Sequence, residues 1–99
     1  MKQITAKNQM TKVIYRFRKN QVFVKCNNLQ HSRQIISQLE DRGWIITQSS
    51  SWIRCEYPRE LIKLDEGETD VDIEMNFINL FLMNLRKAGF EIKLEEIEE

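Results

Sequence analysis

The stretch Leu39–Thr47 reads LEDRGWIIT, and Leu85–Lys93 repeats its pattern as LRKAGFEIK. Each copy has a leucine, three mostly charged residues, a glycine, an aromatic residue and an isoleucine two positions later. This is typical of a helix that ends in a glycine with a positive φ, which costs glycine little because it has no Cβ. The repeat therefore predicts two similar helix-to-strand corners, with Trp44 and Phe90 packing onto a sheet.

Apolar residues recur at helical spacing before each of the two glycines. The first predicted helix begins after Asn27-Asn28, which offers an N-cap, and ends near Arg42. The second begins at Thr69 or Asp70, where the carboxylates that follow suit the positive end of the helix dipole. It runs to about Ala88, so each predicted helix leads directly into one corner.

Alternating apolar and polar residues, rich in β-branched and aromatic types, predict five strands. These strands cover Thr11–Arg18, Gln21–Cys26, Trp44–Thr47, Trp52–Tyr57 and Phe90–Leu94. Lys19-Asn20 predicts a tight turn between the first two strands, and the polar residues 48–51 predict a hairpin turn. At the ends of the chain we expect a flexible arm over residues 1–10 and a frayed acidic tail over residues 95–99.

The predicted order of elements is β, β, α, β, β, α, β. Without its first strand this order is βαββαβ, the ferredoxin-like arrangement of two split βαβ units. We therefore predict a single α+β domain over residues 1–99, with a mainly antiparallel sheet, two helices on one face and an extra N-terminal strand. The extra strand competes with the last strand for one sheet edge. One of the two must lie at another edge or pair with another subunit.

The composition bounds the class of protein. No run approaches the ~20 apolar residues that span a bilayer, and the first residues lack the apolar segment of a signal peptide. We therefore expect a cytoplasmic protein that does not enter a membrane. Isoleucine, lysine, asparagine and glutamate are plentiful and alanine is scarce, which is compatible with an AT-rich genome such as that of many viruses and mobile elements.

Charge is distributed unevenly along the chain. Residues 1–39 contain eight basic residues and no acid, whereas residues 51–99 contain thirteen acidic and six basic residues, although the whole chain has a formal net charge of zero. The two halves either neutralise each other in the fold or leave a cationic N-terminal surface. The second alternative predicts a surface for phosphate groups or for an acidic protein.

Aromatic and basic residues coincide on the outward positions of the predicted strands. Bases stack on aromatic rings and phosphates attract Lys and Arg, so such a surface suits single-stranded nucleic acid, including RNA. The candidate nucleic-acid contacts are Arg16, Arg18, Lys19, Phe23, Lys25, Trp52 and Arg54.

The second predicted helix has more apolar residues than one core face needs. One stripe, expected to face the sheet, comprises Val71, Met75, Ile78, Leu82 and Leu85. A second stripe is covered either by this chain or by another molecule, and an exposed apolar patch of this size marks an interaction site. The candidate partner interface comprises Ile73, Phe77, Leu80, Phe81 and Asn84.

Residues that carry chemistry are few. His31 has no nominated partner within hydrogen-bond reach, and Cys26, His31 and Cys55 lack the paired spacing of a zinc site. We therefore expect that the protein is not an enzyme and that it binds no cofactor, metal or small-molecule substrate. The first functional hypothesis is a non-catalytic regulatory protein that docks to a protein partner or to itself as a homodimer, and the alternative is a single-stranded nucleic-acid-binding module.

Overall fold

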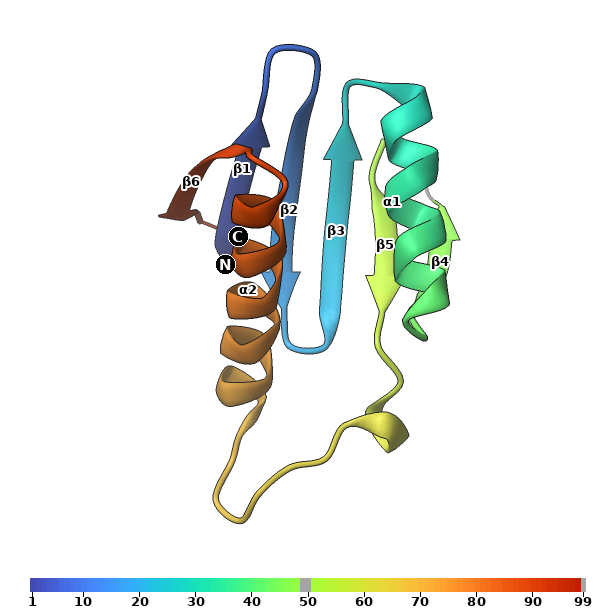
Figure 1. Ribbon diagram of the computed structural model, residues 1–99. Helices are drawn as coiled ribbons and strands as arrows, with labels where there is room; N and C mark the ends of the chain where they lie inside the picture. Colours follow the sequence, from blue (N-terminus) through green and yellow to red (C-terminus); the bar gives the residue numbers. More distant parts are fainter. Residues whose placement is uncertain (49–50, 99) are drawn as a thin grey trace.

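The computed structural model describes residues 1–48 and 51–98, and within them the chain is an α+β fold (Figure 1). Its elements in chain order are β1 (Lys2–Lys7), β2 (Lys12–Arg18), β3 (Gln21–Cys26), α1 (Leu29–Asp41), β4 (Ile45–Gln48), β5 (Ile53–Glu56), the short 3-10 helix η1 (Arg59–Leu61), α2 (Asp70–Lys87) and β6 (Glu91–Glu96). The hairpin turn predicted over residues 48–51 lies partly outside the described residues.

The strands form one six-stranded sheet in the order β4-β5-β3-β2-β1-β6, and every neighbouring pair is antiparallel. β3, β5 and β4 are neighbours, as a split βαβ unit requires. β6 lies beside β1, however, and the β1–β2 hairpin separates it from β3 (Figure 1). The strand order therefore does not confirm the ferredoxin-like topology. The extra N-terminal strand, β2, and the last strand, β6, do not compete for one sheet edge, because they pair with opposite sides of β1.

The prediction of a flexible arm over residues 1–10 is wrong for most of that range, because β1 lies inside the sheet. β1 pairs with β2 on one side and with β6 on the other, and Ile4 and Ala6 are completely buried. The Asn8 side chain accepts hydrogen bonds from the backbone N–H groups of Met10 and Thr11 and so closes the β1–β2 turn. The predicted acidic tail likewise begins inside β6 rather than after it.

The core cluster contains buried residues of the sheet and of both helices, and Figure 1 draws the helices in front of the sheet. Strand residues alternate between this core and the opposite side of the sheet, as the pleat of a strand requires. From β2, Val13, Tyr15 and Phe17 are buried, and from the helices Ile35 and Ile78 pack into the same cluster. Aromatic rings connect the helical layer to the sheet, and they belong to Tyr15, Phe17, Trp44, Tyr57, Phe77 and Phe81.

The two helix-to-strand corners predicted from the repeat are confirmed. Gly43 has a φ of 94° and Gly89 a φ of 83°. In the first corner the N–H groups of Trp44 and Gly43 donate to the carbonyls of Leu39 and Glu40. In the second, the corresponding residues make the same two bonds: Phe90 donates to Leu85 at 3.1 Å and Gly89 to Arg86 at 3.1 Å. This pattern is the Schellman motif, which satisfies the last carbonyls of a helix.

Replacing Gly89 by alanine is expected to lower the free energy of unfolding by about 1–2 kcal/mol, the cost of a left-handed backbone for a residue with a Cβ. The space around Gly89 is open, so a Cβ would meet no other atom within 4 Å and the cost arises in the backbone alone. Urea denaturation would measure it. Ala88→Ser, one position earlier at an exposed site with an ordinary helical φ, is the control. An unchanged stability of Gly89→Ala would contradict the requirement for a positive φ.

The N-terminus of the chain lies in a small cluster of charges. The α-amino group is 3.0 Å from a carboxylate oxygen of Glu96, and Lys2 is 3.4 Å from the other oxygen. The hydrogen bond from the α-amino group is the main reason that the pKa of Glu96 is lowered. Glu74 of α2 lies nearby, and partial burial raises the pKa of its carboxyl, because the charged form is less well hydrated there.

Replacing Glu74 by glutamine is expected to raise Tm at pH 7 by about 2 °C, a small effect because the carboxyl is largely solvated. A carboxyl with a raised pKa in the folded state stabilises the fold below its unfolded pKa and loses that contribution as the pH rises through the folded pKa. The gain should therefore be absent at pH 3, where the carboxyl is protonated in both states. Thermal unfolding at the two pH values measures the difference, and an equal gain at both would contradict this explanation.

Candidate nucleic-acid interface

The five residues of the predicted partner interface do not share one exposed surface. Ile73 is buried, and Phe77 and Phe81 are half-buried among aromatic rings of their own chain. Phe77 lies 4.9 Å from the ring centroid of Trp44, and Phe81 lies 5.3 Å from that of Phe17. Of the other two residues, Asn84 is half-buried and Leu80 is exposed. These contacts favour cover by the chain itself, one of the two alternatives that the sequence left open.

The buried face of α2 is wider than a single stripe. Ile78, Leu82 and Leu85 of the predicted stripe are buried, but Val71, which was expected in the core, is 65% exposed. Val71 lies in the first turn of α2, before the helix reaches the main hydrophobic cluster. Phe77 and Phe81 enter the core because Trp44 brings a large side chain to the helix from the end of α1.

The side of the sheet opposite the core is called the open face here, and it brings distant residues into one row. Successive strand pairings place Gln3 of β1 beside Arg16 of β2, Arg16 beside Phe23 of β3, and Phe23 beside Arg54 of β5. Directly paired residues in antiparallel strands have side chains on the same face, about 5 Å apart. Arg16, Phe23 and Arg54 therefore form a continuous band across the middle of the sheet.

The open face is strongly basic over four neighbouring strands. On β1, β2, β3 and β5 its outward positions contain one acid, Glu56. The basic residues at these positions are Lys7, Lys12, Arg16, Arg18, Lys25 and Arg54. Beyond them, the outward positions of β6 are Glu91, Lys93 and Glu95, and Lys93 lies 3.6 Å from Glu95, so this edge has no net positive charge.

Trp52 provides the second aromatic ring of this surface. The guanidinium carbon of Arg16 is 4.5 Å from its ring centroid, and the ammonium nitrogen of Lys25 is 5.6 Å away. Cations at such distances are attracted to the electron-rich ring face. Arg16 also donates from Nε to the side-chain oxygen of Gln3 at 2.8 Å, and Gln3 donates to Glu95 at 3.1 Å. These contacts hold the guanidinium group in place above the sheet.

Ion pairs neutralise little of this basic area. Arg54 is 3.6 Å from Glu56 of the same strand. Across residues 1–48 and 51–98, no ion pair joins Arg16 or Lys25 to a carboxylate. The two charged halves of the sequence therefore do not cancel each other residue by residue at the centre of the open face.

The structure gathers five of the seven predicted nucleic-acid contacts, namely Arg16, Phe23, Lys25, Trp52 and Arg54. Arg18 lies at the end of β2, and Lys19 lies in the β2–β3 turn with a φ of 54°, away from the central row. Sequence reasoning missed Gln3 and Lys7, because both belong to the strand that was expected to be an arm. The available signal was the short alternation around Ile4 and Ala6, which was too brief to predict a strand.

Three further residues with titratable side chains lie away from the open face: Cys55, Tyr15 and His31. Burial raises the pKa of the Cys55 thiol to about 12, so this group stays protonated and unreactive near neutral pH. Burial also raises the pKa of Tyr15. The His31 ring lies 5.8 Å from that of Phe90. Within the described part of the chain, no group of three His, Cys, Asp or Glu side chains could hold a metal ion.

Three comparisons with known proteins add no family to this description. Neither a protein-family model, nor a curated protein, nor a solved structure matches the chain. In the described residues, no helix combines the length and the apolar character needed to cross a membrane.

Proposed function

We propose that this protein binds single-stranded nucleic acid on the open face of its sheet. The observation that carries the proposal is the row of Arg16, Phe23 and Arg54 on three neighbouring strands, with Trp52 next to Arg16 and Lys25. Guanidinium and ammonium groups bind phosphate oxygens, while aromatic rings stack on unpaired bases. The bases of a duplex are already stacked on each other, so aromatic side chains on a sheet favour a single strand such as RNA.

The positive charge of the open face favours a polyanion, rather than a second copy of the same face, as its binding partner. Two such faces would oppose Arg16, Lys25 and Arg54 to one another, and like charges across an interface are repulsive. On β6 the open face has two glutamates and one lysine, Lys93, which is paired with Glu95, so the bound strand is expected to run over β1, β2, β3 and β5.

The proposal includes an inference about architecture. We infer that both helices lie on one face of the sheet in a single domain, so that the other face of the sheet stays accessible. We infer that the segment from β3 to β6 has a ferredoxin-like arrangement in which the β1–β2 hairpin lies between β3 and β6. This insertion is what widens the basic face, because β2 contributes Arg16 and Lys12 and β1 contributes Lys7.

Fluorescence anisotropy with labelled 12-nucleotide RNA and DNA, single- and double-stranded, tests the proposal. We expect binding to the single strands, weaker binding to the duplexes, and a fall of log K with log salt with a slope of about −2 to −3. Three or four phosphate contacts at roughly −0.7 each on a single strand give this slope. The absence of binding to every probe at ~20 mM salt would overturn the proposed function.

A second candidate function is docking of a regulatory, non-catalytic protein to a protein partner or as a homodimer in the cytoplasm. The observation that favours it is the exposure of Leu80 and Met83, which lie one turn apart on the outer side of α2. The mass in solution at high concentration tests the homodimer. A dimer that dissociates in Leu80→Ser with Met83→Ser would support this candidate, and a monomer at every concentration would remove self-association.

A further inference from the structure

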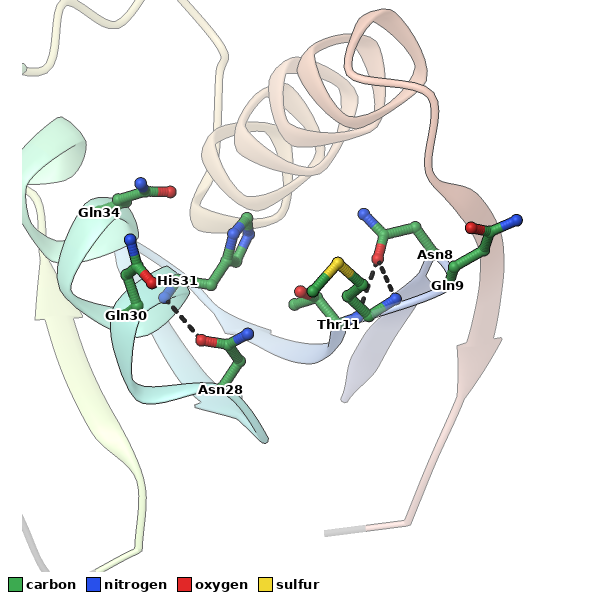
Figure 2. Close-up of a pocket in the computed structure, with 8 residues that line it drawn as sticks. Asn8, Gln9, Thr11, Asn28, Gln30, His31 and Gln34 are labelled. Atoms are coloured by element: carbon green, nitrogen blue, oxygen red, sulfur yellow. Dashed lines mark hydrogen bonds between the residues drawn. The ribbon is translucent and has the colours of Figure 1, made fainter.

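A second polar site lies at the end of the sheet where β1, β2 and β3 approach α1. It is an open cavity of about 450 Å³ between the β1–β2 turn and the first turns of α1 (Figure 2). Its lining comprises Asn8, Gln9, Met10, Thr11, Asn28, Gln30, His31 and Gln34. Five of these eight residues are amides and none is a lysine, arginine, aspartate or glutamate. A ligand would therefore be recognised here by hydrogen bonds rather than by ionic attraction.

The hydrogen bonds within the cavity wall determine what it offers to a ligand. The Asn8 side-chain oxygen accepts from two backbone N–H groups of its turn, and the Asn28 oxygen accepts from the N–H of His31 at 3.1 Å. Both asparagines therefore keep their NH₂ groups as donors (Figure 2). Gln30 and Gln34 are exposed on α1 and can present both a donor and an acceptor. A planar ligand edge with adjacent donors and acceptors matches this set.

We propose that this cavity binds a base of the same nucleic-acid strand, and that it selects adenine. On the base edge that faces the major groove in a duplex, Asn and Gln make paired hydrogen bonds to N6 and N7 of adenine, whereas O6 and N7 of guanine are usually read by Arg or Lys and N4 of cytosine by Glu or Asp. The cavity has the first type of side chain and lacks the other two. Its volume lies within the range of small-ligand sites, so a single base fits.

The cavity lies at the end of the sheet that carries part of the basic surface. Lys25 stands next to Trp52, and Lys12 pairs with Lys7 at the start of β2. The Asn27 side chain accepts a hydrogen bond from the backbone N–H of Lys12 and ties this strand end to the start of α1. A strand that turns from the open face around this end of the sheet toward α1 would have Lys25 and Lys12 beside its phosphates. This inference rests on the proposed function and adds base selectivity to it.

Anisotropy titrations with labelled A₁₂, U₁₂ and C₁₂ RNA at one low salt concentration test the inference. We expect the unchanged protein to bind A₁₂ at least about fivefold more tightly than U₁₂ or C₁₂, the lower end of the discrimination that one paired contact provides. In Gln30→Ala with Gln34→Ala, binding of A₁₂ should fall to that of U₁₂. The affinity for U₁₂ and the salt slope should stay unchanged, because phosphate contacts are retained.

Gln38→Ala is the matched control, since Gln38 is an exposed amide on the same helix but lies outside the cavity. It should keep the preference for A₁₂, and circular dichroism should show that all variants are folded. Equal binding of the three RNAs by the unchanged protein would overturn the adenine site. A preference for A₁₂ that survives in the double variant would overturn it too. Neither result would affect the proposed function. Failure to bind any RNA would overturn the adenine site, and failure to bind the single-stranded DNA as well would overturn the proposed function.

Discussion

Phe81→Ala is expected to lower the free energy of unfolding by about 3 kcal/mol, within the usual range for truncation of a packed phenylalanine. The ring of Phe81 contacts three aromatic rings, those of Tyr15, Phe17 and Trp44, at centroid distances of 5.3, 5.3 and 6.0 Å. Alanine would remove these contacts and leave a cavity between α2 and the sheet, because the neighbouring rings cannot fully collapse into the space. Urea denaturation followed by tryptophan fluorescence measures the change, and Trp44 lies at the affected site.

Leu80→Ala is the matched control for this prediction. Leu80 precedes Phe81 in the same helix but is 41% exposed, so its truncation should cost less than about 1 kcal/mol. The pair distinguishes a core residue from an interface residue. A Phe81→Ala variant that keeps full stability and loses only self-association would contradict the packing described here and would restore α2 as a partner surface.

Lys25→Glu with Arg54→Glu is expected to weaken binding to single-stranded RNA at least about a hundredfold at 0.1 M salt. Each reversal replaces an attraction to phosphate by a repulsion, and like charges held close together cost several kcal/mol. Both residues are exposed, so the exchange should leave the fold intact. If each contacts one phosphate, the slope of log K against log salt should also become shallower by about 1.4. Anisotropy over a salt series gives both quantities.

Lys63→Glu with Lys87→Glu serves as the control, because it changes the net charge by the same amount at exposed positions outside the open face. We expect a loss of less than about threefold, since exposed charges beyond a Debye length of ~10 Å are largely screened at 0.1 M salt. Equal losses in the two double variants would show that binding depends on total charge alone. That outcome would remove the open face as the specific site.

The turn between β2 and β3 shows how local signals succeeded in part. Lys19-Asn20 predicted a tight turn, and the pairing of Arg18 with Gln21 confirms it. The positive φ belongs to Lys19, however, and not to the asparagine that usually tolerates it. Asn20 is used elsewhere, because its side-chain amide donates to the carbonyl of Tyr57 at 2.8 Å and ties the turn to the end of β5. The turn therefore combines a local conformation at Lys19 with a contact to a segment far away in the chain.

Alternation within one strand was enough to predict which side of the sheet a residue faces. Arg16 and Phe23 could be assigned to the outward side of their strands, but their position in one row with Arg54 depends on the pairing of three strands. The amide cavity could not be predicted, because Asn8 and Gln34 are brought together only by the meeting of a turn and a helix. Phe77 and Phe81 were assigned to a partner because nothing in the sequence shows that Trp44 reaches α2.

The sequence by itself determined the two helix-to-strand corners and the charge imbalance between the halves of the chain. It also limited the N-caps to Asn27-Asn28 and to Thr69 or Asp70, and the structure has them at Asn28 and Thr69. These features depend on neighbouring residues, through backbone φ, short hydrogen bonds and composition. Only the tertiary structure decided that β1 lies between β2 and β6. The physical reason is that a short strand gains its stability from hydrogen bonds and burial supplied by partners distant in the chain, which its own few residues do not specify.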